Sequence, residues 1–433
     1  MSFLIRIFSP TIFIISFLLL SFTFYKSEIY HYGNFSGHYL PYYILSILLL
    51  FFSFITFFIN QKIKEYLIII FITLVTTLYL FELYLTLTNT NSAEQISKKN
   101  LYEKKTGKKW DNRTGYEFYR DLKKKHNKTV LYIPPVAHID KDQSIFPLSG
   151  ISNSKTIHCN ENGYFSIYQS DKYGFNNPDT EWDKKEIEYL LIGDSFVHGA
   201  CVNRPNDISS VLRRLSNKTV LNLGYAGNGP LIQYATLREY INKKVKKVLW
   251  VYYEGNDLND LSYELKKNFL MIYLNDLKYS QNLKLKQNII DNLSLNIISE
   301  IESFNFKLFK FIKISKTRLH IKKDHELRAE KIPFEEFRKL LKSAKTLVNK
   351  NNSKLYFIYL PEFDRYKKDY DTSEYNLIKN IVSELNIPLI DIHKKVFENK
   401  HNPLNQFPFN QHGHYTVDGY SEVAEAIYKL SKD

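Results

Sequence analysis

The chain has 433 residues, of which 44% are hydrophobic and 24% charged, and it carries a formal net charge of +14. An isoelectric point near 9.2 raises the question of nucleic-acid binding. Lys, Ile, Asn, Tyr and Phe are abundant along the whole length, so the excess reflects overall composition, and no recognisable nucleic-acid-binding fold accompanies it. We therefore exclude a nucleic-acid-binding function.

Three apolar stretches without charged side chains lie within the first hundred residues: Thr11–Tyr25, Tyr42–Ile59 and Tyr66–Phe81. With their flanks they approach the roughly 20 residues needed to cross a bilayer. Tyrosines lie at their edges, where amphipathic rings prefer the headgroup region. The segment Ser21 to Lys26 offers no small-x-small cleavage site, which argues against a cleaved signal peptide. We expect residues 1–87 to form three transmembrane helices.

The distribution of basic residues gives two opposing indications of orientation. Arg6, Lys62 and Lys64 favour a cytoplasmic side that leaves the long C-terminal part outside the cytoplasm. Lys98 and Lys99 follow the third stretch and favour the inside, although long domains translocate largely regardless of charge. The two cysteines, Cys159 and Cys201, would pair in an oxidising compartment. Two unrelated core cysteines are the alternative. We expect the intrachain disulfide and an extracytoplasmic C-terminal part.

Residues 88–186 are predicted to form a basic connector and a lead-in to the C-terminal domain. Between residues 88 and 130 there are twelve Lys or Arg against five Asp or Glu, so +7 of the net charge lies beside the expected membrane segment. Such a stretch suits anionic headgroups or an acidic glycan, and a solvated linker is the alternative.

The most informative segment is Glu188–Val202, in which an apolar run stops at Gly193, Asp194 and Ser195. A short apolar run bounded by glycine is typical of a buried parallel strand, and open α/β sheets place ligands at the carboxyl ends of their strands. Ser195 is therefore the candidate nucleophile. A Ser or Asp that only caps the next helix is the alternative.

Further strand ends follow in chain order. Val220–Leu223 leads into a turn with Gly227, and Val248–Tyr253 leads into Gly255 and Asn256. Residues 261–331 are predicted to be a helical insertion, either an embellishment or a lid. The fourth and fifth strands are expected at Leu355–Leu360 and Ile387–Ile392, and the helices at Phe334–Asn349, Asp371–Leu385 and Ser421–Leu430.

These blocks, with His414 before the last helix, resemble the SGNH or GDSL hydrolase superfamily from about Asp171 to the C-terminus. The resemblance implies a three-layer α/β/α, flavodoxin-like domain with a five-stranded parallel sheet over residues 187–433. It also implies Ser195 as nucleophile, Gly227 and Asn256 in the oxyanion hole, and His414 as general base. A serine hydroxyl needs such a base, and the tetrahedral intermediate needs aligned hydrogen-bond donors.

One position departs from the family pattern. An aspartate usually precedes the catalytic histidine by three residues, and here that position is Gln411. Three interpretations stay open: a Ser–His dyad with a neutral acceptor holding the ring, an acid from elsewhere such as Asp391 or Asp418, or weakened or lost activity. His412 is a rival to His414 as the base.

The sequence contains no metal-binding motif and implies no cofactor. We expect a membrane serine esterase or O-acyltransferase acting on acyl esters of a cell-envelope glycan or lipid. The alternative is a catalytically inactive SGNH-like module that binds such a ligand.

Overall fold

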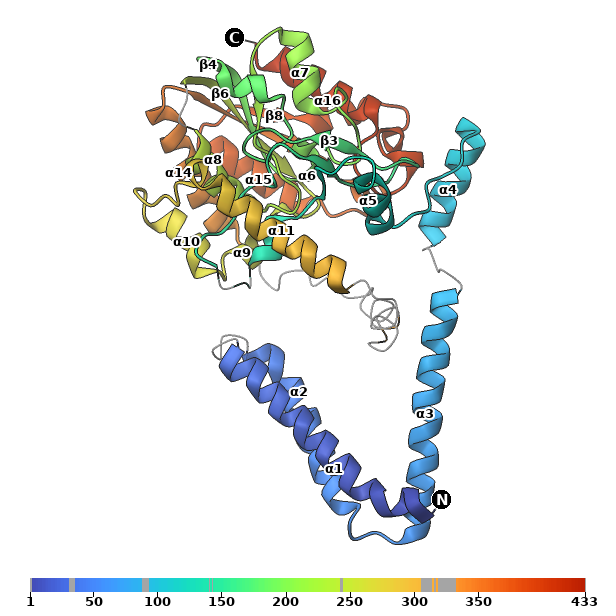
Figure 1. Cartoon of the computed structure of the whole chain (residues 1–433). Coiled ribbons are helices and arrows are strands. Elements are labelled where there is room, and N and C mark those ends of the chain that lie inside the picture. Colours follow the sequence, from blue (N-terminus) through green and yellow to red (C-terminus); the bar gives the residue numbers. More distant parts are fainter. Residues whose placement is uncertain are drawn as a thin grey trace. The chain divides into compact units, whose positions relative to one another are not determined.

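The computed structural model describes residues 2–30, 36–87, 93–139, 141, 143–241, 244–304, 314, 317 and 332–432 (Figure 1). The chain divides into two compact units. The first contains the N-terminal helices α1 (Ser2–Phe24), α2 (Ser36–Ile55) and α3 (Gln61–Leu87). The second contains every strand and the helices from α4 (Ala93–Thr106) to α16 (Val417–Leu430).

Two described helical segments of the first unit are long and apolar enough to cross a membrane, Phe3–Ile29 and Gln61–Thr86, with 27 and 26 residues. Their large apolar side chains are exposed, including Phe17, Leu18, Ile70 and Leu74 at 53%, 59%, 59% and 63%. A soluble protein would bury such side chains in a core, because each buried side chain stabilises the folded state by about 1.5–3 kcal/mol. These two helices therefore lack the packing of a soluble core.

The prediction of three spanning helices is wrong for the middle one. Its described apolar part is Tyr39–Ile55, and the chain then turns at Thr56–Phe58 before α3 begins. The apolar run Phe57–Ile59 continues through the turn, and so the sequence showed no boundary there.

The second unit is built on a five-stranded parallel sheet, which confirms the predicted α/β class. Its strands are β4 (Glu186–Ile192), β5 (Val220–Asn222), β6 (Lys244–Tyr253), β7 (Lys354–Leu360) and β8 (Leu389–Asp391), in the order β5-β4-β6-β7-β8. Numbered along the chain this is 2-1-3-4-5, the flavodoxin-like order. The carboxyl ends of all five strands therefore share one edge.

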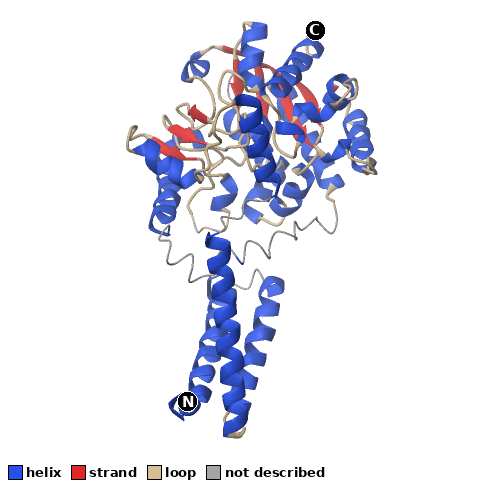
Figure 2. Cartoon of the chain, turned by 90° about the vertical axis from the view of Figure 1, so that its right-hand side faces the viewer, coloured by secondary structure: helices blue, strands red, loops and turns tan. Residues whose placement is uncertain are grey.

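Helices cover both faces of this sheet and give the predicted three layers (Figures 1 and 2). On one face, α8 (Pro230–Tyr240), α14 (Phe334–Lys350) and α15 (Ser373–Glu384) pack into a core with Leu190 and Trp250. On the other, α7 (Ile208–Ser216) and α16 pack with Leu191 and Leu249. Both faces of the strands are buried, and this is why the strands are continuously apolar.

A second sheet precedes the main one within the predicted lead-in. It contains β1 (Thr129–Leu131), β2 (Lys155–Ile157) and β3 (Ile167–Gln169), with β1 and β2 parallel and β2 and β3 antiparallel. Helix α5 (Gly115–Lys123) contributes Tyr119 to the small core beside it.

The predicted helical insertion is helical over its described part. It contains the second half of α9 (Asp257–Glu264), then α10 (Asn268–Asn275) and α11 (Gln287–Phe304), and its remainder lies largely outside the described residues. Helix α11 packs on the lead-in: Asp291 accepts hydrogen bonds from the N–H and hydroxyl of Ser152 at 2.8 and 2.6 Å. This described part braces the lead-in.

Several short turns of helix complete the described fold: α6 (Ser195–His198), η1 (Tyr25–Tyr30), η2 (Pro135–His138), η3 (Asp179–Asp183), η4 (Leu283–Leu285), η5 (Asp364–Tyr366), η6 (His393–Phe397), η7 (Pro403–Gln406) and η8 (Pro408–Asn410).

Candidate active site

Ser195 is the first residue of α6, directly beyond the carboxyl end of β4. Asp194 caps this helix by accepting the Phe196 N–H at 2.9 Å, and it also accepts the Ser195 hydroxyl at 3.2 Å. Gly193 permits the sharp turn, because a Cβ there would lie 2.4 Å from the Val197 side chain. Asp194 and not Ser195 is therefore the N-cap of α6. Ser195 lies half-buried at the edge of the sheet.

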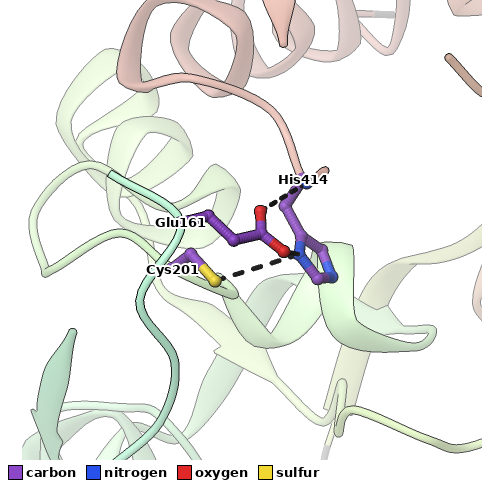
Figure 3. Close-up of side chains that lie close together, drawn as sticks. All are labelled: Glu161, Cys201 and His414. Carbon is purple, nitrogen blue, oxygen red and sulfur yellow. Dashed lines mark hydrogen bonds and ion pairs between the residues drawn. The ribbon is translucent and has the colours of Figure 1, made fainter. Parts of the chain in front are cut away.

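His414 is held by a carboxylate from a distant part of the chain (Figure 3). Glu161 Oε2 accepts the His414 backbone N–H at 2.7 Å, and Glu161 Oε1 lies 3.0 Å from His414 Nδ1. An ionised carboxylate only accepts hydrogen bonds, so Nδ1 carries the proton and Nε2 is left to act as a base. The imidazole also packs on Phe196, with the ring centroids 4.9 Å apart.

The charges of this pair shift both pKa values. Burial opposes ionisation of Glu161, but the charge and hydrogen bonds of His414 outweigh it and lower the pKa of Glu161 to about 2. Burial alone would lower the pKa of His414, whereas the charge and hydrogen bond of Glu161, aided by Asp194, raise it. The pair therefore favours an ionised carboxylate beside a basic imidazole.

Sequence reasoning missed Glu161. It lies in the irregular segment between β2 and β3, where no strand or helix pattern marks it. The one available signal was its position two residues after Cys159, whose predicted partner Cys201 follows Ser195 by six residues. The predicted disulfide implies that this segment lies close to Ser195, but it does not by itself indicate a role for Glu161.

The residues proposed to replace the missing aspartate lie elsewhere. Gln411 Nε2 donates to the Ser97 hydroxyl at 2.6 Å. Asp391 accepts the Tyr375 hydroxyl at 2.6 Å, and Asp418 is exposed in the first turn of α16. The carboxylate that contacts His414 therefore comes from the lead-in.

Helix α4 also contacts the loop that carries His414. Lys98 Nζ donates to the His412 carbonyl at 2.5 Å, one residue after the contact between Ser97 and Gln411. The His412 side chain is exposed, and its ring lies 6.0 Å from that of Phe363. In the described contacts it is His414, and not His412, that has a carboxylate at hydrogen-bond distance.

Asn256 follows β6 and begins α9. Its Nδ2 donates to Asp260 Oδ2 at 2.8 Å, one helical turn ahead. Burial, together with the charge of Asp194, raises the pKa of Asp260 to about 7. An amide NH₂ has two hydrogens, so the bond to Asp260 fixes the side chain and leaves one donor for a ligand.

One cavity of about 1080 Å³ is lined by Glu161, Ser195, Asn256 and His414. Gly227 lies in the turn after β5 with a φ of +79° and is not among the lining residues of this cavity. A Cβ at Gly227 would lie 3.3 Å from the Pro134 side chain. Three of the four residues named from the sequence thus face one cavity, and Glu161 joins them.

The structure joins Cys159 and Cys201 in the predicted disulfide, with their Cα atoms 5.0 Å apart. Cys201 Sγ lies 3.9 Å from His414 Nδ1, and one potential ligand atom each from Glu161, Cys201 and His414 fall within 4.8 Å of one another (Figure 3). Metals bind the cysteine thiolate, which a disulfide does not offer. We therefore interpret the cluster as a His–carboxylate pair beside a disulfide. The absence of a cofactor stays a prediction.

Comparison with protein-family models gives no match, and comparison with curated proteins gives none either. Similar solved structures include a putative lipolytic protein of the G-D-S-L family from Desulfitobacterium hafniense DCB-2, with 15% identity over 57% of this chain and 99% of that chain and a TM-score of 0.32. The acetyl xylan esterase AlAXEase has 15% identity over 57% of this chain and 100% of its own, with a TM-score of 0.35. A lipase/acylhydrolase from Enterococcus faecalis has 12% identity over 56% of this chain and 94% of its own, with a TM-score of 0.31. These solved structures are GDSL lipolytic proteins and esterases.

Proposed function

We propose that the protein is a membrane-anchored serine esterase or O-acyltransferase with a Ser195–His414–Glu161 triad. The observation that carries the proposal is the two-point contact of Glu161 with the imidazole and backbone of His414, at the cavity that Ser195 also lines. A carboxylate that holds the proton on Nδ1 and stabilises the imidazolium is what a Ser–His pair needs in acyl transfer.

In the proposed reaction, the Ser195 hydroxyl attacks the acyl carbon while His414 Nε2 accepts its proton. The oxyanion is stabilised by the Asn256 amide and the Ser195 N–H. Gly227, which does not line this cavity, is given no part in the proposed oxyanion hole. Collapse expels the alcohol, which takes the proton from His414. Water or a second alcohol then attacks the acyl-enzyme, giving hydrolysis or transfer respectively.

The location of the reaction is part of the proposal. Two spanning helices place the N-terminus and the second unit on the same side of the membrane. Lys26, Lys62 and Lys64 lie at the ends of the two spans that border the intervening segment, which favours a cytoplasmic connection, whereas Arg6, Lys98 and Lys99 at the opposite ends favour the reverse. The disulfide decides between them in this proposal. A disulfide between Cys159 and Cys201 fits an oxidising compartment. The substrates would then be acyl esters of an envelope glycan or lipid.

The inactive binding module was kept as an alternative because of Gln411. Glu161 supplies the charge that Gln411 lacks, which removes the main reason for that alternative. We therefore rank the enzyme first.

The test is fluorophosphonate labelling and p-nitrophenyl acetate hydrolysis by the full-length protein in detergent. We expect labelling of the wild type, none of Ser195→Ala, and a loss of about 10²-fold or more in kcat for His414→Ala. His412→Ala is the matched control, two residues away in the same loop, and we expect it to keep most of the activity.

Two results would contradict the proposal. An unlabelled wild type would leave the binding module as the better interpretation. Activity lost in His412→Ala but kept in His414→Ala would assign the base to the wrong histidine.

A further inference from the structure

The carboxylate of the proposed triad depends on a loop without regular secondary structure. Glu161 lies in the connection between β2 and β3, which the structure describes as bends from Glu161 to Tyr164. Loops of this kind do not fix a side chain to the ~0.5 Å that a catalytic contact requires. Other contacts must therefore hold Glu161 against His414.

The disulfide provides the contact nearest to the nucleophile. Cys159 precedes Glu161 by two residues, and Cys201 follows α6, which begins with Ser195. Asn162 Nδ2 donates to the Cys201 carbonyl at 3.1 Å, so the chain is tied to the same turn on both sides of Glu161. The crosslink thus joins the acid-bearing loop covalently to the element that carries the nucleophile.

Two described contacts of this loop lead away from the active site. Asn160 Nδ2 donates to the Asp111 carbonyl at 3.0 Å, and Asp111 N–H donates to Gly163 O at 3.0 Å. Both attach the loop to the connector and restrain its outer side. On the side of α6, the His158 ring lies 4.4 Å from the ring of His198, so packing acts there beside Asn162 and the disulfide. The disulfide is the covalent link among these contacts.

Moving the Glu161 carboxylate from water into the site costs free energy, and this cost opposes its contact with His414. Glu161 is partly buried, with 24% of its side chain exposed, and burial works against its ionised form. Without a tether, the loop would exchange both contacts with His414 for water, at the cost of one ion pair and one backbone hydrogen bond, each of modest worth when partly exposed.

We propose that the Cys159–Cys201 disulfide is a positioning element of the active site, which holds Glu161 against His414 and thereby sets the basicity of the imidazole. The kinetic part of this inference rests on the proposed function. The positional part concerns only Glu161 and His414.

Other titratable groups act on His414 besides Glu161. Asp194 caps α6, Lys98 belongs to α4, and the buried His158 and His198 also act on the imidazole. His158 lies one residue before Cys159, but burial lowers its pKa to about 3, so it stays neutral across the working range. Reduction also frees the Cys201 thiol, 3.9 Å from His414 Nδ1. A change in His414 therefore reports the loss of Glu161 only where Cys159→Ser/Cys201→Ser, which has no thiol there, shows the same change.

The kinetic test compares oxidised and reduced full-length protein in detergent. An added dithiol supplies two electrons and two protons, is itself oxidised to its cyclic disulfide, and leaves two free thiols. We expect kcat for p-nitrophenyl acetate to fall by about 10²-fold, as for other misplaced catalytic groups, with KM little changed. We also expect the acid limb of the pH profile to move to lower pH.

Two matched variants keep the test specific. Cys159→Ser/Cys201→Ser should match the reduced wild type and show no response to the dithiol. Glu161→Gln should be slow in both redox states and equally insensitive. Reoxidation should restore the wild type. A wild type with the same kcat and the same acid limb before and after reduction would overturn the inference.

A second readout separates this inference from the proposed function. The pKa of the His414 ring can be followed by NMR in oxidised and reduced protein, with the resonance assigned from His414→Gln. We expect reduction to lower that pKa whether or not the protein hydrolyses any ester. An unchanged pKa would overturn the positional claim, whereas an inactive wild type with a shifted pKa would overturn only the proposed function.

Discussion

Glu161 is the residue on which the proposed chemistry depends most, and it can be tested alone. Glu161→Gln keeps the size of the side chain and removes its charge. We expect kcat to fall by about 10² to 10⁴-fold, because the imidazolium formed during attack loses its counter-charge. The measurement is kcat for p-nitrophenyl acetate beside the wild type.

The controls for this variant come from the residues that the sequence first suggested. Asp418→Asn should have little effect, because Asp418 is exposed in α16. Adding Gln411→Asp to Glu161→Gln should not restore activity, since Gln411 faces Ser97. Rescue by Gln411→Asp would show that the family position can still reach His414.

The pH dependence of the same variant has a definite sign. Glu161 raises the pKa of His414, and only the neutral imidazole acts as a base, so the acid limb of kcat/KM lies above the ordinary histidine value. Removing the charge lets burial dominate and lowers that pKa. The acid limb of Glu161→Gln should therefore move to lower pH while the plateau falls. An unmoved limb would indicate that Glu161 does not interact with the base.

Some of these residues could be predicted from the sequence because a regular element presents them. Ser195 and Asn256 follow apolar strands, and His414 precedes an amphipathic helix. Glu161 follows no such pattern, because the contact with His414 is made across 253 residues by a loop. Local periodicity carries no information on a contact of that kind.

At the scale of elements, α9 is expected to orient the Asn256 amide through Asp260, one turn ahead. Asp260→Ala should lower kcat with little change in KM, and the loss should not exceed that of Asn256→Ala, about 10² to 10³-fold for one oxyanion donor. Asp260→Asn keeps an acceptor oxygen and should lose less. The three variants can be compared under one set of assay conditions, and a normal kcat for Asp260→Ala would remove this role.

The elements themselves were largely predictable where burial sets the pattern. The strand predicted at Leu355–Leu360 is observed as Lys354–Leu360, and the helix predicted at Phe334–Asn349 ends one residue later. The lead-in was harder, because its strands have three residues each and share a small core with α11 from the insertion. Such short strands give too few alternations for a pattern to be read.

At the scale of the whole molecule, the exposed apolar helices predict how the protein partitions. We expect the full-length chain to stay in the membrane fraction after an alkaline carbonate wash and to need detergent for release. Ile70→Lys combined with Leu74→Lys should weaken retention in the membrane fraction, because inserting a charged side chain at mid-membrane costs about 2.5–3.5 kcal/mol of free energy. Recovery of the wild type in the soluble fraction would contradict membrane anchoring.

The number of spans makes a separate prediction about sidedness. With two spans, reporters fused at the N-terminus and at the C-terminus should both be active on the same side, and three spans would place them on opposite sides. We expect both outside, as read by an alkaline phosphatase that is active only there. Activity of the C-terminal reporter alone would restore the middle helix as a span.

The contacts of α4 decide where the protein can be shortened. Ser97 and Lys98 reach the backbone and side chains of the loop that ends at His414, so a water-soluble fragment has to begin before Ala93 to keep that loop supported. A fragment starting at Gly115 would retain every strand and the whole proposed triad. The loop that ends at His414 would nevertheless lose its contacts with α4. Proteolysis between Ala93 and Gly115 that released α4 would remove the same contacts from the intact chain.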